Sequence, residues 1–576
     1  MNNMAASLIE KKTRCYLPEA FRIDSWEDLS SYFEELESRI LSSKEDLEKW
    51  LRDCSELESV VSEEVCWRQI RMTCDTEDPQ LAESFEFFMT SIQPMIQPVA
   101  DRLNRKLIDC PFTATLDSEK YFTYLRNVRK NIELFRESNV PIQSALAVAQ
   151  QEYGVISGKM TIEVKGAEYT LAQASRFLED PDRSLRKSVY HKIFQRRAQD
   201  REKLESLFEG LLEKRQQLAL NAGYADYRSY RFAELGRFDY SPKDCELFHR
   251  AVREQVMPLV NELMEAKRKQ LGVDRLRPWD LEAEPIGTQP LRPFQAGDEL
   301  IEKTIGCLQR LDPFFSSCIS TMLEMGRLDV ESRKGKAPGG YNCPLAETGA
   351  PFIFMNAAGT LDDVTTMVHE SGHAVHSFLC HPLELNGFKE YPTEIAEVAS
   401  MSMELFTMDH WSNFFSDPKE LKRAKQQQLE RVILLFPWIA TIDAFQHWLY
   451  LHPGHSRAER ETVWLEILDT YTSPVVDVTG TESYRSILWQ RQLHLFEVPF
   501  YYIEYGIAQL GAIGMWQQYQ QNPDLALSRY RKALQAGGTR TLPELFALAG
   551  LQFDLSPQHI GTLMRFVKTA LEKIGH

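Results

Sequence analysis

Apolar residues recur along most of the chain at the spacing of an amphipathic helix. One such set with the i, i+3, i+4, i+7 pattern is Leu47, Trp50, Leu51, Cys54 and Leu57. Ser43 and Asp46 precede it as a capping-box start. A second set is Leu204, Leu207, Phe208 and Leu211. Similar segments continue to the C-terminus, so the chain is predicted to be mainly α-helical.

Strand patterns are few. The segment Lys159–Leu171 alternates apolar and polar residues around Lys165 and Gly166, which predicts a small hairpin. A second β-like region, residues 328–355, is rich in glycine and proline and ends in the stretch PFIFMN. That stretch comes just before a histidine-rich segment, so we expect a small β element beside it.

The histidine-rich segment, VHESGHAVH, begins at Val368. Thr360 and Asp363 predict that a helix begins at Leu361. On that helix, His369 and His373 lie one turn apart on the same face, so both imidazoles can bind one metal ion at ~2.0–2.1 Å. Glu370 points about a quarter turn away, within reach of a water on the metal. This is the H-E-x-x-H pattern of zinc hydrolases.

A catalytic zinc generally has three protein ligands, so a third is needed. The next segment, YPTEIAEVASMSMELF, predicts a second helix that Thr393 can cap, with Glu394, Glu397 and Glu404 near one face. A glutamate from this helix would complete a set of two histidines and one carboxylate. Glu397 follows His373 by 24 positions, which leaves room for a turn and a helical return.

The neighbouring residues have other interpretations. We assign His376 to packing or to support of a ligand rather than to the metal. Glu394 is expected to complement the dipole of its helix. Glu404 either holds a ligand histidine by its second nitrogen or forms an interhelical pair. The alternative to a metal site is a helix that carries several histidines by chance.

Composition narrows the possible partners. The chain has 576 residues and a formal net charge of -17, with a pI near 5.4, so its surface repels phosphate backbones and anionic lipid. We therefore expect no nucleic-acid and no membrane partner. Ten cysteines are scattered singly, which is typical of reduced thiols in a cytoplasmic protein. The first residues lack a signal-peptide core, and the longest apolar run, Val432–Ala440, is too short to span a membrane.

Several stretches together resemble the M3 family of zinc oligopeptidases, in its oligoendopeptidase F branch. The resemblance covers most of residues 115–570. Its stretches are APFIFMNAAGTLDDVTTMVHESGHAVH, PTEIAEVASMSMELF, NAGYADYRSYRFAELGRFDYS, RKGKAPGGYNCP, LFEVPFYYIEYGIAQLGA and GGTRTLPELFALAGLQF.

The resemblance implies one zinc ion per chain, bound by His369, His373 and Glu397, with Glu370 as the catalytic base. It also implies a mainly α, two-lobed, zincin-type oligopeptidase fold around a deep central channel that admits short peptides. The stretch PFIFMN would be the partner strand, with a free edge that could pair with a peptide. The chain would divide into an N-terminal helical region 1–115, a helical segment with a small β-hairpin 116–190, and a catalytic domain 191–576.

The late stretch QLHLFEVPFYYIEYGI carries four further candidates on one predicted helix. They are His494, Tyr501, Tyr502 and Tyr505. The family uses tyrosines and a histidine from this region to stabilise an oxyanion and to bind substrate, and Tyr502 with Tyr505 match the family's tyrosine pair best. Val498 and Pro499 depart from the thimet-like branch, which has a further tyrosine there.

The resulting hypothesis is a zinc metallo-endopeptidase that hydrolyses internal bonds of short unstructured peptides. The alternatives are a metallocarboxypeptidase or dipeptidyl carboxypeptidase with the same site, an inactive peptide-binding protein, and a structural helical protein. Sequence assigns no basic group to hold a peptide's C-terminal carboxylate. The glycines beside Tyr341 could form a mobile loop over bound peptide or a surface turn.

Overall fold

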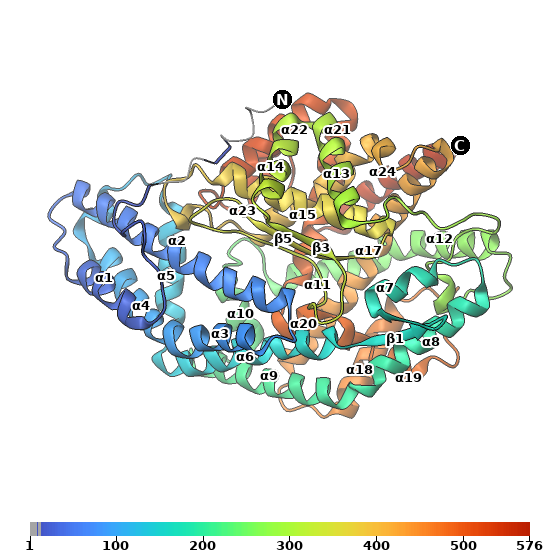
Figure 1. Cartoon of the computed structure of the whole chain (residues 1–576), viewed down its shortest axis with the longest axis horizontal. Helices are drawn as coiled ribbons and strands as arrows, with labels where there is room; N and C mark the ends of the chain where they lie inside the picture. The colour runs from blue at the N-terminus through green and yellow to red at the C-terminus, as the bar shows by residue number, and fades with distance from the viewer. Residues whose placement is uncertain (1–7, 10–12, 576) are drawn as a thin grey trace.

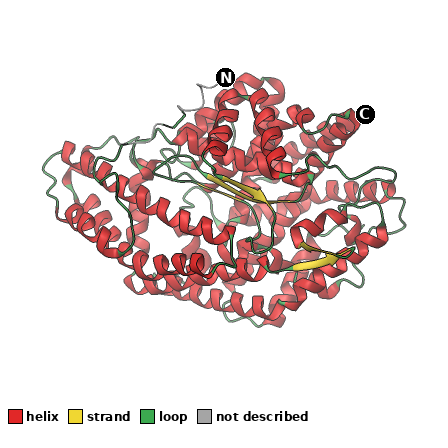
Figure 2. Cartoon of the chain, viewed as in Figure 1, coloured by secondary structure: helices red, strands yellow, loops and turns green. Residues whose placement is uncertain are grey.

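In the computed structural model, which describes residues 8–9 and 13–575, the chain is mainly helical, as the sequence predicts (Figure 2). The stretch in which we looked for a signal peptide lies partly outside the described residues. Figure 1 places α1 and α4 at one end of the molecule, β1 and α8 at the other, and β3 and β5 between them.

The first half of the chain contains these helices and strands: α1 Trp26–Ser38, α2 Lys44–Cys74, α3 Pro79–Phe87, α4 Gln93–Asp109, α5 Phe122–Leu134, α6 Val140–Gly158, β1 Thr161–Val164, β2 Ala167–Thr170, α7 Leu171–Ser175, α8 Arg183–Gln199, α9 Arg201–Asn221, α10 Tyr227–Glu234, α11 Pro242–Ala251 and α12 Met257–Gln270. The second half contains α13 Gly297–Leu311, α14 Pro313–Glu324, β3 Leu328–Glu331, β4 Tyr341–Cys343, β5 Phe352–Ala357, α15 Leu361–Cys380, α16 Thr393–Thr407, α17 Pro418–Leu451, α18 Arg457–Thr470, α19 Glu482–Arg485, α20 Leu493–Glu497, α21 Tyr502–Gln521, α22 Pro523–Gln535, α23 Leu542–Leu548 and α24 Pro557–Gly575.

Helix starts follow the predicted caps closely. The Ser43 side chain accepts a hydrogen bond from the Asp46 backbone N–H at the start of α2. Thr360 and Asp363 form a reciprocal capping box, and α15 begins at Leu361, as predicted. The predicted cap by Thr393 is wrong. Pro392 occupies the cap position of α16 and Thr393 is the first helical residue, with no side-chain cap bond.

The predicted hairpin is present as β1 and β2, an antiparallel pair. Lys165 and Gly166 form its turn with φ values of 52° and 81°. A two-residue turn with both φ angles positive matches the right-handed twist of the strands, which explains why glycine is needed at one position. The hairpin packs with α7 and α8 over a small apolar cluster that includes Val164 and Val189.

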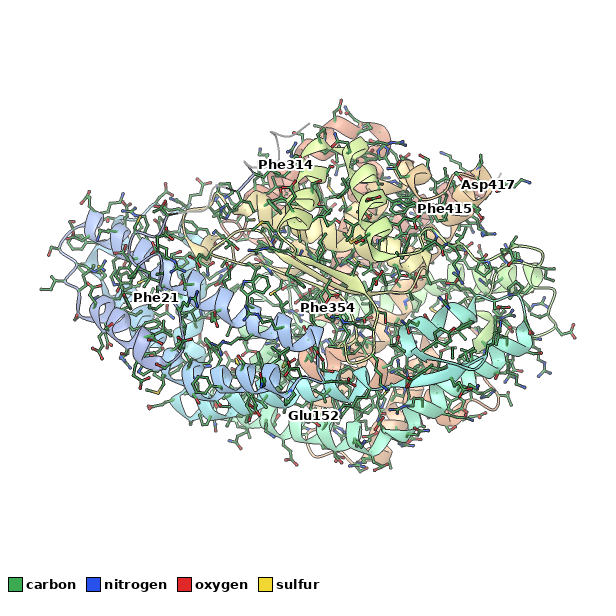
Figure 3. All side chains as sticks on the ribbon, in the orientation of Figure 1. Phe21, Glu152, Phe314, Phe354, Phe415 and Asp417 are labelled. Carbon is green, nitrogen blue, oxygen red and sulfur yellow. The ribbon has the colours of Figure 1, made fainter. Side chains whose placement is uncertain are left out.

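The central sheet has the strand order β3-β5-β4, with β5 parallel to β3 and antiparallel to β4. The expectation that PFIFMN offers a free edge is therefore wrong, because described strands pair with both edges of β5. The edge strands are β3 and β4. Tyr341 of β4 stacks on Phe354 of β5 with ring centroids 4.7 Å apart, and Figure 3 places Phe354 near the middle of the molecule.

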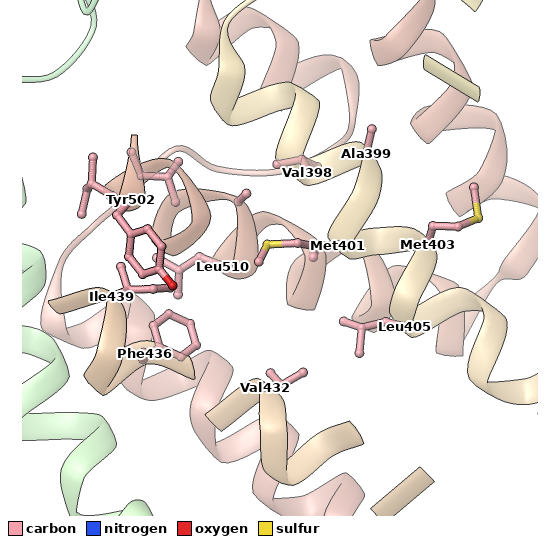
Figure 4. Packing of buried hydrophobic residues seen from close by; sticks show 14 of the residues in the cluster. Val398, Ala399, Met401, Met403, Leu405, Val432, Phe436, Ile439, Tyr502 and Leu510 are labelled. Carbon is pink, nitrogen blue, oxygen red and sulfur yellow. The ribbon is translucent and has the colours of Figure 1, made fainter. Parts of the chain in front are cut away.

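Helix α16 lies at the centre of the largest core. All its residues from Glu394 to Thr407 are buried, because α15 and α21 both pack along it. Figure 4 shows apolar side chains of α16, such as Met401, near Phe436 of α17 and Leu510 of α21. A carboxylate on such a helix is buried among apolar groups, so it needs a specific partner.

Helix α17 packs against α21 at the border of this core. Within the described part of the chain it alone is long and apolar enough to cross a membrane by length and composition, but 72% of that apolar window is buried inside the protein. Its apolar residues thus serve the core of the fold. They include Val432–Ala440, the longest apolar run in the sequence.

The crossing of α15 and α16 depends on a glycine. A Cβ added at Gly372 would lie 2.5 Å from Ser400 Cα and 2.7 Å from Ala399 O, both backbone atoms. Backbone at this distance cannot move aside without shifting a helix. Gly372 lies between His369 and His373, so the spacing of the two helices is set where the histidines face α16.

We expect Gly372→Ala to lower the free energy of unfolding by about 1–3 kcal/mol through overpacking. A melting temperature measured by fluorescence would report this loss. The matched control is Gly210→Ala in α9, where an added Cβ meets only Lys214 Nζ at 3.8 Å. That variant should melt at the same or a higher temperature, because alanine is the better helix former. Equal melting temperatures for the two variants would contradict the tight crossing.

Candidate metal centre and active site

Two histidines of α15 and one glutamate of α16 come together where these two helices cross. His369 Nε2 lies 3.2 Å and His373 Nε2 lies 3.5 Å from the same carboxylate oxygen, Glu397 Oε2. One ligand atom from each of the three residues lies within 4.8 Å of the others. Two imidazoles and one carboxylate at this separation fit zinc, which takes nitrogen and oxygen ligands at ~2.0–2.2 Å.

Side chains behind these three fix their orientation. His369 Nδ1 lies 2.8 Å from Glu404 Oε1. Gln428 Nε2 of α17 donates to Glu404 Oε2 at 3.0 Å, and Thr365 donates to Gln428 Oε1 at 3.1 Å. Because Glu404 binds the Nδ1 side of His369, Nε2 is the nitrogen that would bind a metal. The structure places Glu404 against the second ring nitrogen of His369, in a contact that also joins α15 to α16.

Glu397 is held from its other side. Ser400 Oγ donates to Glu397 Oε2 at 3.0 Å, and the Tyr501 hydroxyl donates to Glu397 Oε1 at 2.5 Å. Sequence reasoning placed Tyr501 among the late candidates but gave it no partner, and it missed Gln428 entirely. Gln428 lies inside a long helix, 24 positions beyond Glu404, and no local pattern distinguishes it.

The charges of the three groups depend on one another. Burial alone would raise the pKa of Glu397, but the imidazoles of His373 and His369 hold it well below its usual range. Burial alone would lower the pKa of His369, but hydrogen bonds to Glu397 and Glu404 raise it well above its usual range. The carboxylates thus favour a positive charge between them, which a bound cation would supply in place of the imidazole proton.

Glu370 lies beside this group without joining it. Burial raises the pKa of its carboxyl, and its Oε2 atom has no hydrogen-bond partner among the described residues. Glu370 lines a cavity of about 200 Å³ together with His369, Tyr502 and Tyr505. A carboxylate that lines a cavity and keeps one oxygen without a partner can accept a proton from a molecule bound there.

A larger cavity of about 730 Å³ adjoins the small one. Gly339 lines the large cavity and the next residue, Gly340, lines the small one. Likewise, Leu434 lines the large cavity and Leu435 lines the small one. The Gly339–Gly340 segment is anchored on both sides. The next residue, Tyr341, hydrogen-bonds Thr73 of α2 at 2.6 Å between oxygens, so the segment joins the active site to the N-terminal helices.

The late candidates do not lie on one helix, which corrects the prediction. His494 belongs to α20, whereas Tyr502 and Tyr505 belong to α21. Between them the chain turns at Phe500, whose φ is 67°, so Pro499 lies in the turn and not near the start of a continuous helix. The turn folds His494 back against Tyr505, with His494 Nε2 and the hydroxyl 3.1 Å apart.

A chain of hydrogen bonds sets the direction of that contact. Trp438, which can only donate, bonds Gln492 Oε1 at 2.9 Å, so the Gln492 amide nitrogen points to His494 Nδ1 at 2.7 Å. His494 Nδ1 then accepts, and its Nε2–H donates to Tyr505. Burial lowers the pKa of His494 to about 4, so the ring is neutral. The proton of the Tyr505 hydroxyl is left to point into the cavity.

The hydroxyl groups of Tyr505 and Tyr502 differ in their contact with His494. Burial raises the pKa of Tyr505 well above its usual range, so its hydroxyl stays protonated and able to donate. Burial also raises the pKa of Tyr502, to about 12. Both line the small cavity, and only Tyr505 contacts His494 through its hydroxyl.

Two other predicted residues lie apart from the metal group. His376 is fully buried and stacks on Tyr391 with ring centroids 3.7 Å apart, and burial lowers its pKa to about 3. Glu394 accepts a hydrogen bond from the Tyr240 hydroxyl at 2.6 Å. Both positions agree with the non-ligand interpretations made from sequence.

The sequence matches two models of one peptidase family. Residues 176–560 match the model of Peptidase family M3, and residues 19–135 match the Peptidase M3 N-terminal domain. The oligopeptidase PepF of Bacillus subtilis is 22% identical over 406 residues, covering 69% of this chain and 58% of that protein. The plasmid oligoendopeptidase F of Lactococcus lactis subsp. cremoris is 24% identical over 405 residues, covering 67% of this chain and 63% of that protein. Both matches span less than two thirds of the relatives' length.

Two solved structures have the same fold as this protein over nearly its whole chain. A putative oligoendopeptidase F and an inhibitor complex of PZ peptidase A each superpose with a TM-score of 0.92 at 26% identity, covering 96% of this chain and 98% of theirs. The match of the family model extends over more than half of the sequence, and it includes the helix of His369 and His373. This protein therefore belongs to peptidase family M3, in its oligoendopeptidase F branch.

Proposed function

We propose that this protein is a zinc metallo-endopeptidase that cleaves internal bonds of short, unstructured peptides. The observation that carries the proposal is the convergence of His369, His373 and Glu397 beside the unpartnered carboxylate oxygen of Glu370, in a small cavity next to a larger one. The larger cavity, about 730 Å³, lies within the range of small-molecule sites, ~300–1,000 Å³. Its size suits a few peptide residues and excludes a folded protein.

Under this proposal His369, His373 and Glu397 hold one zinc ion, which supplies Lewis acidity to the water and to the scissile carbonyl. Glu370 accepts a proton from the attacking water and then gives it to the leaving amine. The Tyr505 hydroxyl donates to the carbonyl oxygen as negative charge develops there. His494 keeps the Tyr505 proton directed into the cavity by occupying its oxygen with an N–H.

The peptide backbone would lie along β4, because β5 has no free edge. β4 is three residues long, Tyr341–Cys343, and follows Gly340, which lines the small cavity. Strand addition at this edge would hold an extended peptide by main-chain bonds that are independent of side-chain identity. The cytoplasmic location and the absence of nucleic-acid and membrane partners stay predictions from composition.

One observation favours the carboxypeptidase alternative. Arg197 and Arg491 both line the larger cavity, and neither forms an ion pair with a carboxylate of the described residues. Burial lowers the pKa of both guanidinium groups. A free C-terminal carboxylate of a bound peptide would be a suitable partner for either arginine. In that case products would be confined to single residues or dipeptides from the C-terminus.

We expect Glu370→Gln to reduce kcat/KM for peptide cleavage by about 10²-fold or more, because glutamine cannot take the proton. Mass spectrometry of a mixture of short peptides, incubated with wild type and variant, would locate the cuts and measure their loss. The variant should keep wild-type zinc content, since Glu370 is not in the ligand set. Internal cuts at a normal rate in the variant would refute the role of Glu370.

We expect Glu404→Gln to weaken zinc binding about 10–100-fold, because His369 loses the acceptor that fixes its tautomer. Zinc content after dialysis against a graded series of chelator concentrations would measure the change. Glu213→Gln, at an exposed glutamate of α9, is the control and should bind zinc like wild type. Wild-type affinity in the Glu404 variant would mean that Glu404 does not support the metal.

We expect Tyr505→Phe to lower kcat by about 10²–10³-fold with little change in KM, since its hydroxyl acts on charge that develops during the reaction. Tyr502→Phe should cost less, because His494 orients the hydroxyl of Tyr505 and makes no such contact with that of Tyr502. Steady-state kinetics on one peptide would compare them. A larger loss in kcat for Tyr502→Phe would reverse the assignment.

A further inference from the structure

A second cluster of metal-ligand residues lies between helices α11 and α17, apart from the candidate active site. α11 contributes Cys245 and His249, four positions apart, and α17 contributes Asp443 and His447, also four positions apart. Residues at this spacing lie on one face of a helix. The two helices pack against each other, so the two faces meet.

We propose that Cys245, Asp443 and His447 form a second metal site that binds Zn²⁺ or a similar thiophilic divalent cation. Their ligand atoms lie within 4.8 Å of one another, as those of the first group do. His447 Nε2 lies 3.3 Å from the Asp443 carboxylate at its Oδ2 atom, and the other oxygen of that carboxylate, Oδ1, is the one without a hydrogen-bond partner. Bonds of ~2.0–2.3 Å to a tetrahedral zinc would set such ligand separations at roughly 3.3–3.8 Å.

The cluster contains buried polar atoms that the protein itself does not satisfy. Cys245 and Asp443 are fully buried and His447 is 6% exposed. Asp443 Oδ1 has no hydrogen-bond partner among the described residues, and His447 Nε2 meets only the Asp443 carboxylate, at 3.3 Å and without hydrogen-bond geometry. Leaving such atoms unpaired in an apolar core costs stability, because each has lost its water. A cation at this point would satisfy the carboxylate oxygen and the imidazole nitrogen together.

His249 has a supporting position in this arrangement. Its Nε2 atom lies 2.8 Å from Asp443 Oδ2, which orients the carboxylate and leaves Oδ1 unpartnered. Glu404 stands in the same relation to His369 in the first site, as an outer partner that fixes a ligand. Outer partners of this kind are a regular part of metal sites.

Charge also fits a divalent cation. Cysteine binds a metal ion as the thiolate, so Cys245 gives up its proton when the ion binds. On metal binding the S–H bond breaks, the proton leaves to solvent and the sulfur–metal bond forms. One thiolate and one carboxylate then balance the two positive charges of the ion, with His447 neutral.

Two arginines face the cluster. Arg228 Nη1 lies 3.3 Å from His447 Nδ1, and Arg237 acts on Cys245 from a longer range. Metal binding through Nε2 places the remaining proton of His447 on Nδ1, so Arg228 has to turn away. Glu246 offers it a partner, since their charged atoms are 4.0 Å apart.

The site would be structural, and it lies under a functional turn. The His447 ring packs on Phe500 with centroids 5.4 Å apart, and the neighbouring Gln446 accepts a hydrogen bond from the Phe500 N–H at 2.5 Å. Phe500 has positive φ and precedes Tyr501, which bonds Glu397. A metal that joins α11 to α17 would therefore stabilise the strained turn from which Tyr501 reaches the first site.

Cobalt provides the sharpest test, because only the second site contains sulfur. Full-length protein is stripped of metal, loaded with Co²⁺, and examined in the near ultraviolet for thiolate-to-cobalt charge transfer. We expect this absorption in wild type and in His369→Ala/His373→Ala, and its loss in Cys245→Ser. Cys307→Ser is the matched control, a buried cysteine outside both groups, and should keep the band. Cobalt-loaded wild type without the band would overturn the proposal, whatever happens to the variants.

Zinc content separates this proposal from the proposed function. We expect two zinc ions per chain in wild type, and one in His369→Ala/His373→Ala that disappears when Cys245→Ser is added. One ion in wild type and none in the double histidine variant would refute the second site and leave the first intact. One ion that persists in the double histidine variant and is absent from Cys245→Ser would support the second site and refute the first.

Discussion

The close approach of α15 and α16 is the constraint on which the rest of the active site depends. Gly372 removes the one side chain that would keep the two helices apart, and the histidines on either side of it then face Glu397. Because the contact is backbone to backbone, the separation of imidazole and carboxylate is set by helix packing. The surrounding helices hold this crossing in place, and α16 is buried along nearly its whole length for that reason.

A buried carboxylate on α16 would destabilise the fold unless its charge were compensated. Glu397 is compensated by both His373 and His369, and His369 also contacts Glu404 through its other ring nitrogen. Tyr501, Ser400 and Gln428 complete the hydrogen bonding. The polar groups at the centre of the apolar core therefore form one connected network, and each member restricts the orientation of the next. The network leaves the cavity side of the histidines and of Glu370 open.

Local patterns predicted much of this arrangement. The cap at Thr360, the i, i+4 histidines and the hairpin turn at Lys165 all depend on interactions within a few residues, which sequence displays directly. The free edge expected for PFIFMN was wrong because strand order in a sheet depends on long-range pairing with β3 and β4. The single helix expected from His494 to Tyr505 was wrong because a left-handed Phe500 breaks it, and sequence gives no warning of positive φ at phenylalanine. The role of Gln428 and the cluster between α11 and α17 could not be predicted, because both depend on the packing of helices that are distant in the sequence.

The bond between Tyr341 and Thr73 has a consequence for how the molecule can open. α2 belongs to the N-terminal helices, yet it holds the strand that borders the catalytic cavity, through Tyr341 and through the Ala337 N–H, which donates to Thr73 O at 2.9 Å. A hinge motion that separates the two halves must either carry β4 with α2 or break these bonds. Any movement of α2 is thus transmitted to β4 and to the wall of the cavity, although α2 lies far from the catalytic helices in the sequence.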